Sequence, residues 1–100
     1  MFKSISAEEA KKMIEERKND PKFRIIDFRT QEEFPFKNIS GAENIDFYDP
    51  YVRDRLDELD KERTYLIYCR SGSRSKIALE IMKDLGFKEV YELDGGIISF

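Results

Sequence analysis

The sequence contains no histidine, no tryptophan and only one cysteine. A single cysteine cannot form an internal disulfide, and a chain without histidine lacks a principal zinc ligand, so we expect no metal site. The chain also lacks a long apolar run, because Met1-Phe2-Lys3-Ser4 leads directly into the charged stretch from Ala7 to Lys18. We therefore expect neither a signal peptide nor a membrane span, and we expect a cytoplasmic protein.

The sequence also carries little net charge. The net charge is −3, the isoelectric point is near 5.1, and the two signs are well mixed along the chain. Binding to the phosphate backbone of nucleic acids requires a clustered cationic field, so we expect no nucleic-acid partner. The 100 residues are 40% hydrophobic and contain no repeat or Pro/Gly-rich linker, which predicts one globular domain over residues 1–100.

Short apolar segments alternate along the chain with segments of helical periodicity. Ser6-Ala7-Glu8-Glu9 is a capping box that predicts a helix start, and Asn19-Asp20-Pro21 predicts its end. Such alternation predicts a mostly parallel sheet with helices on both faces, the α/β class. The predicted strands are 23–28, 42–45, 65–68 and 89–93; the predicted helices include 50–59 and one with Ile77, Ala78, Ile81, Met82 and Leu85 on its buried face, ending at Gly86.

Polar residues stand at the ends of two predicted strands. Asp27 and Arg29 stand at the end of the strand predicted at 23–28, and Cys69 follows Tyr65-Leu66-Ile67-Tyr68. Ligands of parallel sheets bind beyond the carboxyl ends of the strands, so these residues mark the expected site. Opposite charges at a strand end commonly tie loops together, and we therefore assign Asp27 and Arg29 a supporting role. Three aromatic residues near this edge are interpreted as core, namely Tyr48, Tyr51 and Tyr68.

The segment Cys69-Arg70-Ser71-Gly72-Ser73-Arg74-Ser75 joins a buried strand to a predicted helix. Its small residues allow successive backbone amides to point inward, and the helix start and two arginines add positive charge. A lone cysteine at a strand end is usually a small core residue, but these neighbours favour a stabilised thiolate nucleophile. Because the chain has no histidine, activation should be electrostatic, and the reactivity of Cys69 should follow a single titration.

Several segments together resemble the rhodanese-like domain family, and the resemblance extends over nearly the whole chain. Lys37-Asn38 differs, because the family usually has Gly-His there. The matching segments, in order, are Asp27-Phe28-Arg29, Glu33-Phe34, Ile39-Ser40-Gly41-Ala42-Glu43-Asn44-Ile45, the loop from Cys69 to Arg74, and Leu93-Asp94-Gly95-Gly96-Ile97.

The resemblance implies a five-stranded, mostly parallel sheet and the activity of a thiosulfate sulfurtransferase. Cys69 would carry a sulfane sulfur as a persulfide, taken from a small anionic donor such as thiosulfate. The acceptor would be cyanide or a thiol, including a thioredoxin-like protein, and no cofactor would be needed. The remaining loop residues would bind the donor and the persulfide: Arg70, Ser71, Gly72, Ser73, Arg74 and Ser75.

Other functions remain open at this stage. Cysteine-dependent phosphatases and arsenate reductases also place a thiolate in an anion-binding loop, but phosphatases have five residues between the cysteine and an arginine. Here Arg74 comes after four residues, and Ser75 stands at the phosphatase position. A non-catalytic rhodanese-like interaction module or a sulfur carrier is the other alternative; retention of Cys69 and both loop arginines argues against the interaction module.

Overall fold

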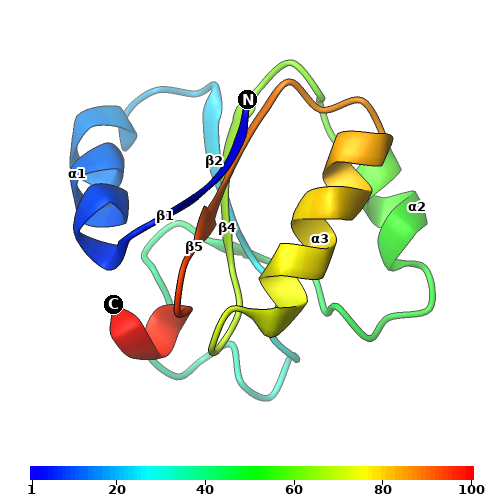
Figure 1. The fold of residues 1–100 in the computed structure, drawn as a ribbon. Helices are drawn as coiled ribbons and strands as arrows, with labels where there is room; N and C mark the ends of the chain where they lie inside the picture. The colour runs from blue at the N-terminus through cyan, green and yellow to red at the C-terminus, as the bar shows by residue number, and fades with distance from the viewer.

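The computed structural model, which describes all 100 residues, contains one sheet of five strands in the order β1-β5-β4-β2-β3. Every pair of neighbouring strands is parallel. Figure 1 shows α1 on one face of the sheet and α2 and α3 on the other, as predicted for the α/β class. The elements are β1 Phe2–Ile5, α1 Ala7–Arg17, β2 Phe23–Asp27, β3 Glu43–Asn44, α2 Val52–Asp57, β4 Thr64–Tyr68, α3 Ser73–Asp84, β5 Glu89–Leu93 and the 3-10 turn η1 Ile97–Ser99.

The sheet separates two apolar cores, and β4 contributes to both. Tyr65 and Ile67 point to the core under α2 and α3, whereas Leu66 and Tyr68 point to the core under α1. All four side chains are at most 1% exposed. Burial of consecutive bulky residues is the pattern of a strand in a parallel sheet with helices on both faces, the class predicted from the sequence. Cys69 continues the alternation and belongs to the core on the α3 side.

The predicted capping box begins α1. The Ser6 hydroxyl accepts a hydrogen bond from the Glu9 backbone amide, and the Glu9 carboxylate accepts one from the Ser6 amide, each at 3.1 Å. The helix ends at Arg17, before the Asn19-Asp20-Pro21 break. Gly86 adopts the left-handed conformation predicted after α3, with φ of 94°.

Some predicted elements differ from the structure. The strand predicted at 42–45 is reduced to Glu43–Asn44, and the helix predicted at 50–59 to Val52–Asp57. In α3 the buried face contains Leu79, while Ile77 is 54% exposed, so the assignment of Ile77 to the buried face was wrong. β1 lies outside the predicted strands because only Ile5 of its four residues is buried, as suits an edge strand.

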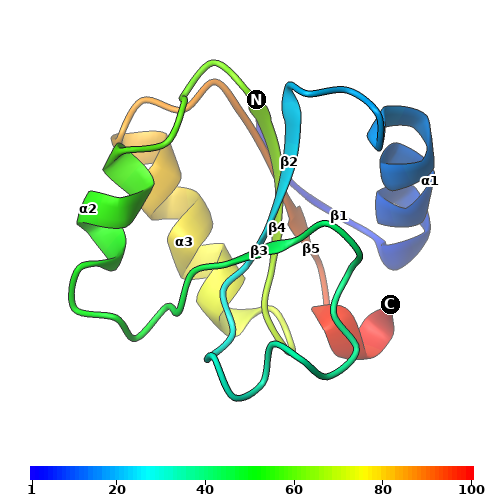
Figure 2. The same cartoon turned by 180° about the vertical axis from the view of Figure 1, so that it is seen from behind.

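The carboxyl ends of β2, β4 and β5 meet at one edge of the sheet. Seen from behind in Figure 2, the loops that follow these strands lie together at the lower end of the molecule, beside the carboxyl terminus. Asp27 ends β2, Cys69 directly follows β4, and Gly95-Gly96 follow β5. The topology therefore brings the predicted site residues to the same edge as the Gly-Gly turn.

Candidate active site

The sulfur of Cys69 lies at the start of α3 as a hydrogen-bond acceptor. The Gly72 amide lies 3.1 Å from Sγ and the Ser75 amide 3.4 Å, and both donate to it. No side chain caps α3, whose N-cap is Gly72 with φ of 107°. The sulfur thus takes the place of a capping oxygen and lies at the positive end of the helix dipole.

This environment changes the ionisation of Cys69. Burial raises the pKa of the thiol, but hydrogen bonds from the Ser75 side chain and from the backbone amides of Ser75, Gly72 and Arg74 more than offset this effect. The net result is a pKa below the ordinary thiol value. The predicted direction therefore agrees with the structure, and it arises without a neighbouring base, because donors to a thiolate favour the charged form.

Arg74 is held in an ion pair and is not free in the loop. Its guanidinium donates two hydrogen bonds to the Glu33 carboxylate, at 2.8 and 3.2 Å, and its Cζ lies 5.7 Å from the Tyr48 ring centroid. The Arg74 hydrogen bonds, together with bonds from Thr30, outweigh burial and lower the pKa of Glu33 to about 2. Arg74 therefore links the loop to the segment that follows β2.

The Glu33–Arg74 ion pair should make the free energy of unfolding depend on pH in the acidic range. The folded pKa of Glu33 lies below its ordinary 4.5, so its stabilisation is complete above 4.5 and is lost as the pH falls toward about 2. We expect the difference in unfolding free energy between wild type and Glu33→Gln to shrink across that interval. Urea unfolding at several pH values measures this difference. Glu32→Gln is the control because Glu32 makes no ion pair, and an equally pH-dependent difference for it would contradict the assignment.

The other predicted loop residues occupy different positions. Arg70, Ser71 and Ser73 are exposed, and their side chains make no hydrogen bond within the protein. Gly72 and Ser75 are buried beside Cys69, and Cys69 itself is 0% exposed. The structure thus brings Gly72 and Ser75 to the sulfur and leaves Arg70 at the surface.

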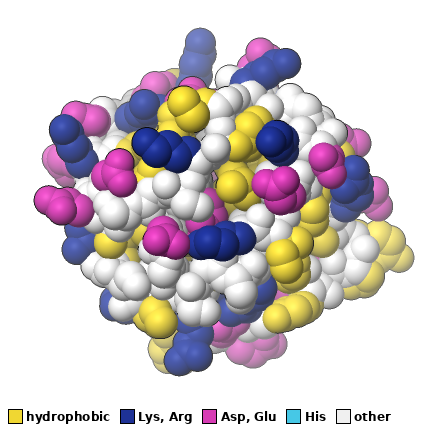
Figure 3. Space-filling view, viewed as in Figure 1, with side chains coloured by type: hydrophobic (Ala, Val, Ile, Leu, Met, Phe, Trp, Pro, Cys, Tyr) yellow, Lys and Arg dark blue, Asp and Glu magenta, His cyan; other side chains and the backbone are white.

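Charged side chains of both signs are interspersed over the face of the molecule shown in Figure 3.

Asp27 and Arg29 form a buried ion pair beside the site. The Arg29 guanidinium donates to both Asp27 carboxylate oxygens, at 2.7 to 3.1 Å, and its other donors reach the carbonyls of Phe34 and Phe36. The two side chains are 0% and 5% exposed. The pair therefore braces the segment that carries Glu33, in agreement with the predicted supporting role.

The Gly-Gly turn after β5 packs directly on the cysteine loop. The Ile97 amide donates to the Cys69 carbonyl at 2.9 Å, and the Ile98 amide donates to the Arg70 carbonyl at 3.2 Å. Gly96 has φ of 67°, and a Cβ there would lie 2.2 Å from the Arg70 carbonyl oxygen. Only glycine allows the two backbones to approach this closely.

Replacement of Gly96 by alanine should displace the loop. The new Cβ would collide with backbone atoms that cannot rotate away, so we expect a destabilisation of about 1–3 kcal/mol beyond that of a control. Gly86→Ala is the matched control, because Gly86 also has a positive φ but has open space around its Cα. Denaturant unfolding measures both variants. Equal losses of stability in the two variants would show that the cost at Gly96 comes from its positive φ alone and not from a collision with the loop.

Two of the three tyrosines assigned to the core do not lie there. Tyr68 is fully buried and its hydroxyl accepts the Ile39 amide at 3.0 Å, but Tyr48 and Tyr51 are 67% and 66% exposed. They follow β3 in a loop held by aspartate side chains, where no second layer covers them.

Lys37, at the position where the resembled family has glycine, adopts a left-handed φ of 56°.

The site also contains a residue that sequence reasoning did not single out. Glu92 lies on β5, is 0% exposed, and accepts a hydrogen bond from the Ser75 hydroxyl at 2.7 Å. The sequence contains many glutamates. The neighbours of Glu92 in this short segment, Val90 and Leu93, give no sign that its side chain is buried. Only the packing of α3 on β5 reveals its contact with the loop.

The structure contains no group of three or more Cys, His, Asp or Glu residues arranged to hold a metal ion. None of its helices has the length and apolar character needed to cross a membrane.

Comparison with known proteins identifies similar chains. A tRNA uridine(34) hydroxylase of Teredinibacter turnerae is 32% identical over 82% of this chain, and a probable adenylyltransferase/sulfurtransferase MoeZ of Mycobacterium tuberculosis is 34% identical over 79%. The chain spans only 27% and 20% of the lengths of these two relatives. A rhodanese-like domain from Anabaena solved in solution covers 99% of this chain and 73% of its own length, with 27% identity and a TM-score of 0.80.

The family model of the rhodanese-like domain matches residues 6–100. This range includes the cysteine loop, the Asp27–Arg29 pair and the Gly-Gly turn. The chain belongs to the rhodanese-like domain family.

Proposed function

We propose that this chain is a sulfurtransferase that moves a sulfane sulfur from an anionic donor such as thiosulfate to cyanide or a thiol. The observation that carries the proposal is the position of Cys69 Sγ, which accepts the Gly72 and Ser75 amides at the start of α3. These donors stabilise a thiolate, and after transfer they can hold a charged persulfide in the same place. The sulfurtransferase named among the relatives supports this chemistry.

The proposed reaction has two steps. In the first, the Cys69 thiolate attacks the outer sulfur of thiosulfate, the S–S bond of the donor breaks, and sulfite leaves with the electron pair. In the second, cyanide or a thiolate attacks the terminal sulfur of the persulfide, and the Cys69 thiolate is released with that bond's electron pair. Neither step needs a base, because the attacking species in each step is an anion.

Access to the sulfur requires motion of the loop. Cys69 is 0% exposed, so a donor reaches Sγ only when the loop from Cys69 to Ser75 opens. The exposed Arg70 guanidinium lies at the surface of this loop and supplies the positive charge that an anionic donor meets first. Many enzymes use local loop motion of this sort to admit a ligand and then exclude water.

Phosphate-ester hydrolysis fits the site less well. A phosphatase needs an arginine that is free to bind phosphate with two hydrogen bonds. Here both terminal nitrogens of Arg74 are engaged by Glu33, and Ser75 stands where the phosphatase arginine would be. Cys69-dependent turnover of an aryl phosphate would contradict this choice.

Intact-mass measurement after incubation with thiosulfate tests the proposal. The wild-type protein should gain the mass of one sulfur atom, and subsequent cyanide should remove it and release thiocyanate. Sulfate, which has no sulfane sulfur, is the control and should add nothing. Absence of the adduct under conditions in which Cys69 can be alkylated would overturn thiosulfate as the donor.

A further inference from the structure

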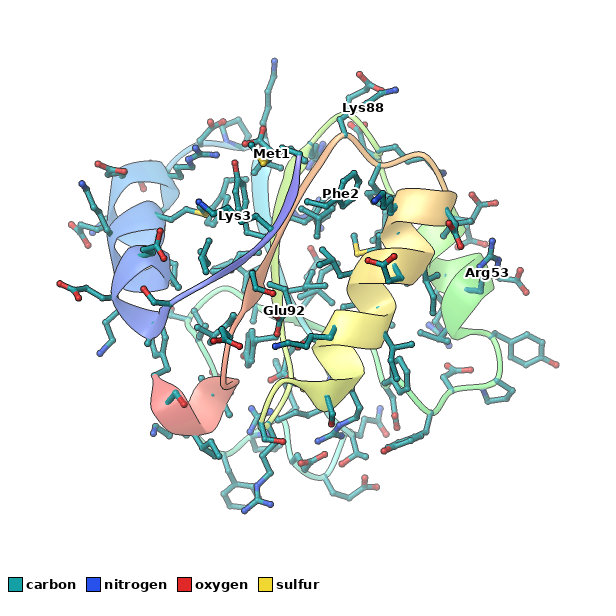
Figure 4. All side chains as sticks on the ribbon, viewed as in Figure 1. Met1, Phe2, Lys3, Arg53, Lys88 and Glu92 are labelled. Carbon is teal, nitrogen blue, oxygen red and sulfur yellow. The ribbon has the colours of Figure 1, made fainter.

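Glu92 on β5 is a fully buried carboxylate beside α3 (Figure 4). Its Oε1 accepts hydrogen bonds from the Ser4 hydroxyl at 2.7 Å and from Lys76 Nζ at 3.2 Å. Its Oε2 accepts a hydrogen bond from the Ser75 hydroxyl at 2.7 Å. Three donors, one of them an ammonium group, favour the charged form of a buried carboxylate. The proposed reaction mechanism does not use this anion.

The Ser75 hydroxyl contacts both this carboxylate and the Cys69 sulfur. Its oxygen is 2.7 Å from Glu92 Oε2 and 3.5 Å from Cys69 Sγ, and the Gly72 carbonyl is a third neighbour at 3.2 Å. A hydroxyl has one hydrogen, so it donates fully to only one acceptor. The carboxylate is the nearest acceptor and is charged, so it takes this hydrogen while the S–H of the Cys69 thiol donates to Ser75 Oγ.

Ionisation of Cys69 turns the sulfur into a second anion that competes for the same hydrogen. The Ser75 hydroxyl lowers the pKa of Cys69 only to the extent that its hydrogen points to the sulfur. The contact with sulfur is the longer of the two, and sulfur is a weaker acceptor than a carboxylate oxygen. Rotation of the hydroxyl toward the sulfur would also remove one of the three donors to the buried Glu92 carboxylate, which is costly.

We propose that Glu92 is a positioning residue that holds the Ser75 hydroxyl hydrogen away from Cys69. The thiolate then depends mainly on backbone amides, and Glu92 limits how strongly the loop favours the charged form. A less basic thiolate is a weaker nucleophile and a better leaving group. Cys69 has both roles in the proposed reaction, because it first attacks the donor and later leaves from the persulfide. Glu92 thereby favours the loading of sulfur over its release.

This inference rests on the proposed function only in its consequence for sulfur transfer. Glu92 acts through Ser75 and does not touch the sulfur donor. Its effect on the ionisation of Cys69 is measured without thiosulfate. The role of Glu92 and the donor chemistry can therefore fail independently.

The charged group that faces Glu92 from α3 is Lys76, which also binds Asp94 in the turn after β5 at 2.9 Å. The hydrogen bonds of Lys76 to Asp94 and Glu92 outweigh burial and raise its pKa, so it stays charged while a thiol titrates. From β1, the contact with Glu92 is made by the neutral Ser4.

The charged group of the loop beside Cys69 is Arg74, which is paired with Glu33. The pKa of Arg74 is raised by this pair, and that of Glu33 is lowered to about 2, so both keep their charge while Cys69 titrates. Ionisation of Cys69 should therefore follow a single step, and a change in its midpoint reports on Ser75 and Glu92.

The pH dependence of alkylation by iodoacetamide tests the proposal on Glu92→Gln. The carbonyl oxygen of the new amide can keep the Ser4 and Lys76 donors, and its NH₂ group then donates to Ser75 Oγ. This arrangement releases the hydroxyl hydrogen to the sulfur. The midpoint of alkylation should therefore fall by about one pH unit relative to wild type, with a single step in both proteins.

Two further comparisons separate the hydroxyl from the charge of Glu92. In a Ser75→Ala background no hydroxyl hydrogen is present, so adding Glu92→Gln should move the midpoint much less than it does alone. Asp94→Asn is the matched control, because it removes an exposed carboxylate that contacts Lys76, and it should leave the midpoint near the wild-type value. An unchanged or raised midpoint in Glu92→Gln, or an equal fall with and without the Ser75 hydroxyl, would overturn the proposal.

A measurement on the wild-type protein keeps the test independent of whether these variants fold. In carbon NMR the Glu92 carboxyl signal should remain that of an ionised group while the Cys69 Cβ signal titrates. The Ser75 hydroxyl hydrogen should keep the resonance of a carboxylate-bonded hydrogen on both sides of the Cys69 midpoint. Titration of the Glu92 signal with Cys69, or transfer of the hydroxyl hydrogen to the sulfur, would overturn the proposal. Constant signals in a protein that forms no thiosulfate adduct would support the role of Glu92 and overturn only the donor chemistry.

Discussion

Replacement of Cys69 by serine should abolish sulfur transfer, with thiocyanate formation from thiosulfate and cyanide falling by more than about 10³-fold. A serine hydroxyl cannot form a persulfide, so it cannot take a sulfane sulfur from thiosulfate and pass it on. It also would not ionise in this loop, because the donors around the sulfur lower the pKa of a thiol but no base is present to take a proton from an alcohol. The size of the effect reflects the loss of the only thiol in the chain.

Steady-state thiocyanate assays with intact-mass analysis measure this loss. Cys69 is fully buried in an apolar core, and serine is smaller and more polar, so the folded state of the variant is checked by its urea midpoint. Ser73→Ala is the matched loop control, because the Ser73 side chain is exposed and makes no bond within the protein; its effect should stay below that of Cys69→Ser by at least about tenfold. Continued production of thiocyanate by a folded Cys69→Ser variant would contradict the proposed mechanism.

Removal of the Arg29 guanidinium should give the largest loss of stability, about 3–5 kcal/mol for Arg29→Ala. The substitution leaves the Asp27 carboxylate in the core without its ionic partner, and it also removes donors from the Phe34 and Phe36 carbonyls. Burial lowers the pKa of Arg29, but its bonds to Asp27 raise it above the ordinary value, so the charge is present throughout the working range. The cost comes from isolating a buried charge more than from losing an attraction.

Urea unfolding compares this variant with two others. Arg29→Lys keeps the charge but cannot reproduce the forked contact with Asp27, so an intermediate loss is expected. Arg24→Ala removes a partner from the partly exposed Arg24–Glu43 pair, which joins β2 to β3, and should cost only about 0–1 kcal/mol. A loss for Arg29→Ala as small as that for Arg24→Ala would show that the buried pair does not stabilise the fold.

Sequence patterns determined the elements that depend on local chemistry. The capping box at Ser6, the central strand ending at Tyr68 and the glycine after α3 were all predicted from short segments, because each depends on neighbours within a few residues. The composition of the Cys69 loop likewise indicated an anion-binding turn, since small residues before a helix expose backbone amides whatever the rest of the fold does. The resemblance supplied the five-stranded sheet.

Tertiary packing decided what each side chain does at the site. Arg74 resembles a ligand for an anion in the sequence, but the fold brings Glu33 to it from a segment 41 residues away. Glu92 becomes part of the loop's hydrogen bonding only because β5 places it beside α3, and Ile77 is exposed because no other element covers its side of α3. Periodicity specifies a local face, whereas burial and ionic partners depend on contacts between distant segments, which no short pattern contains.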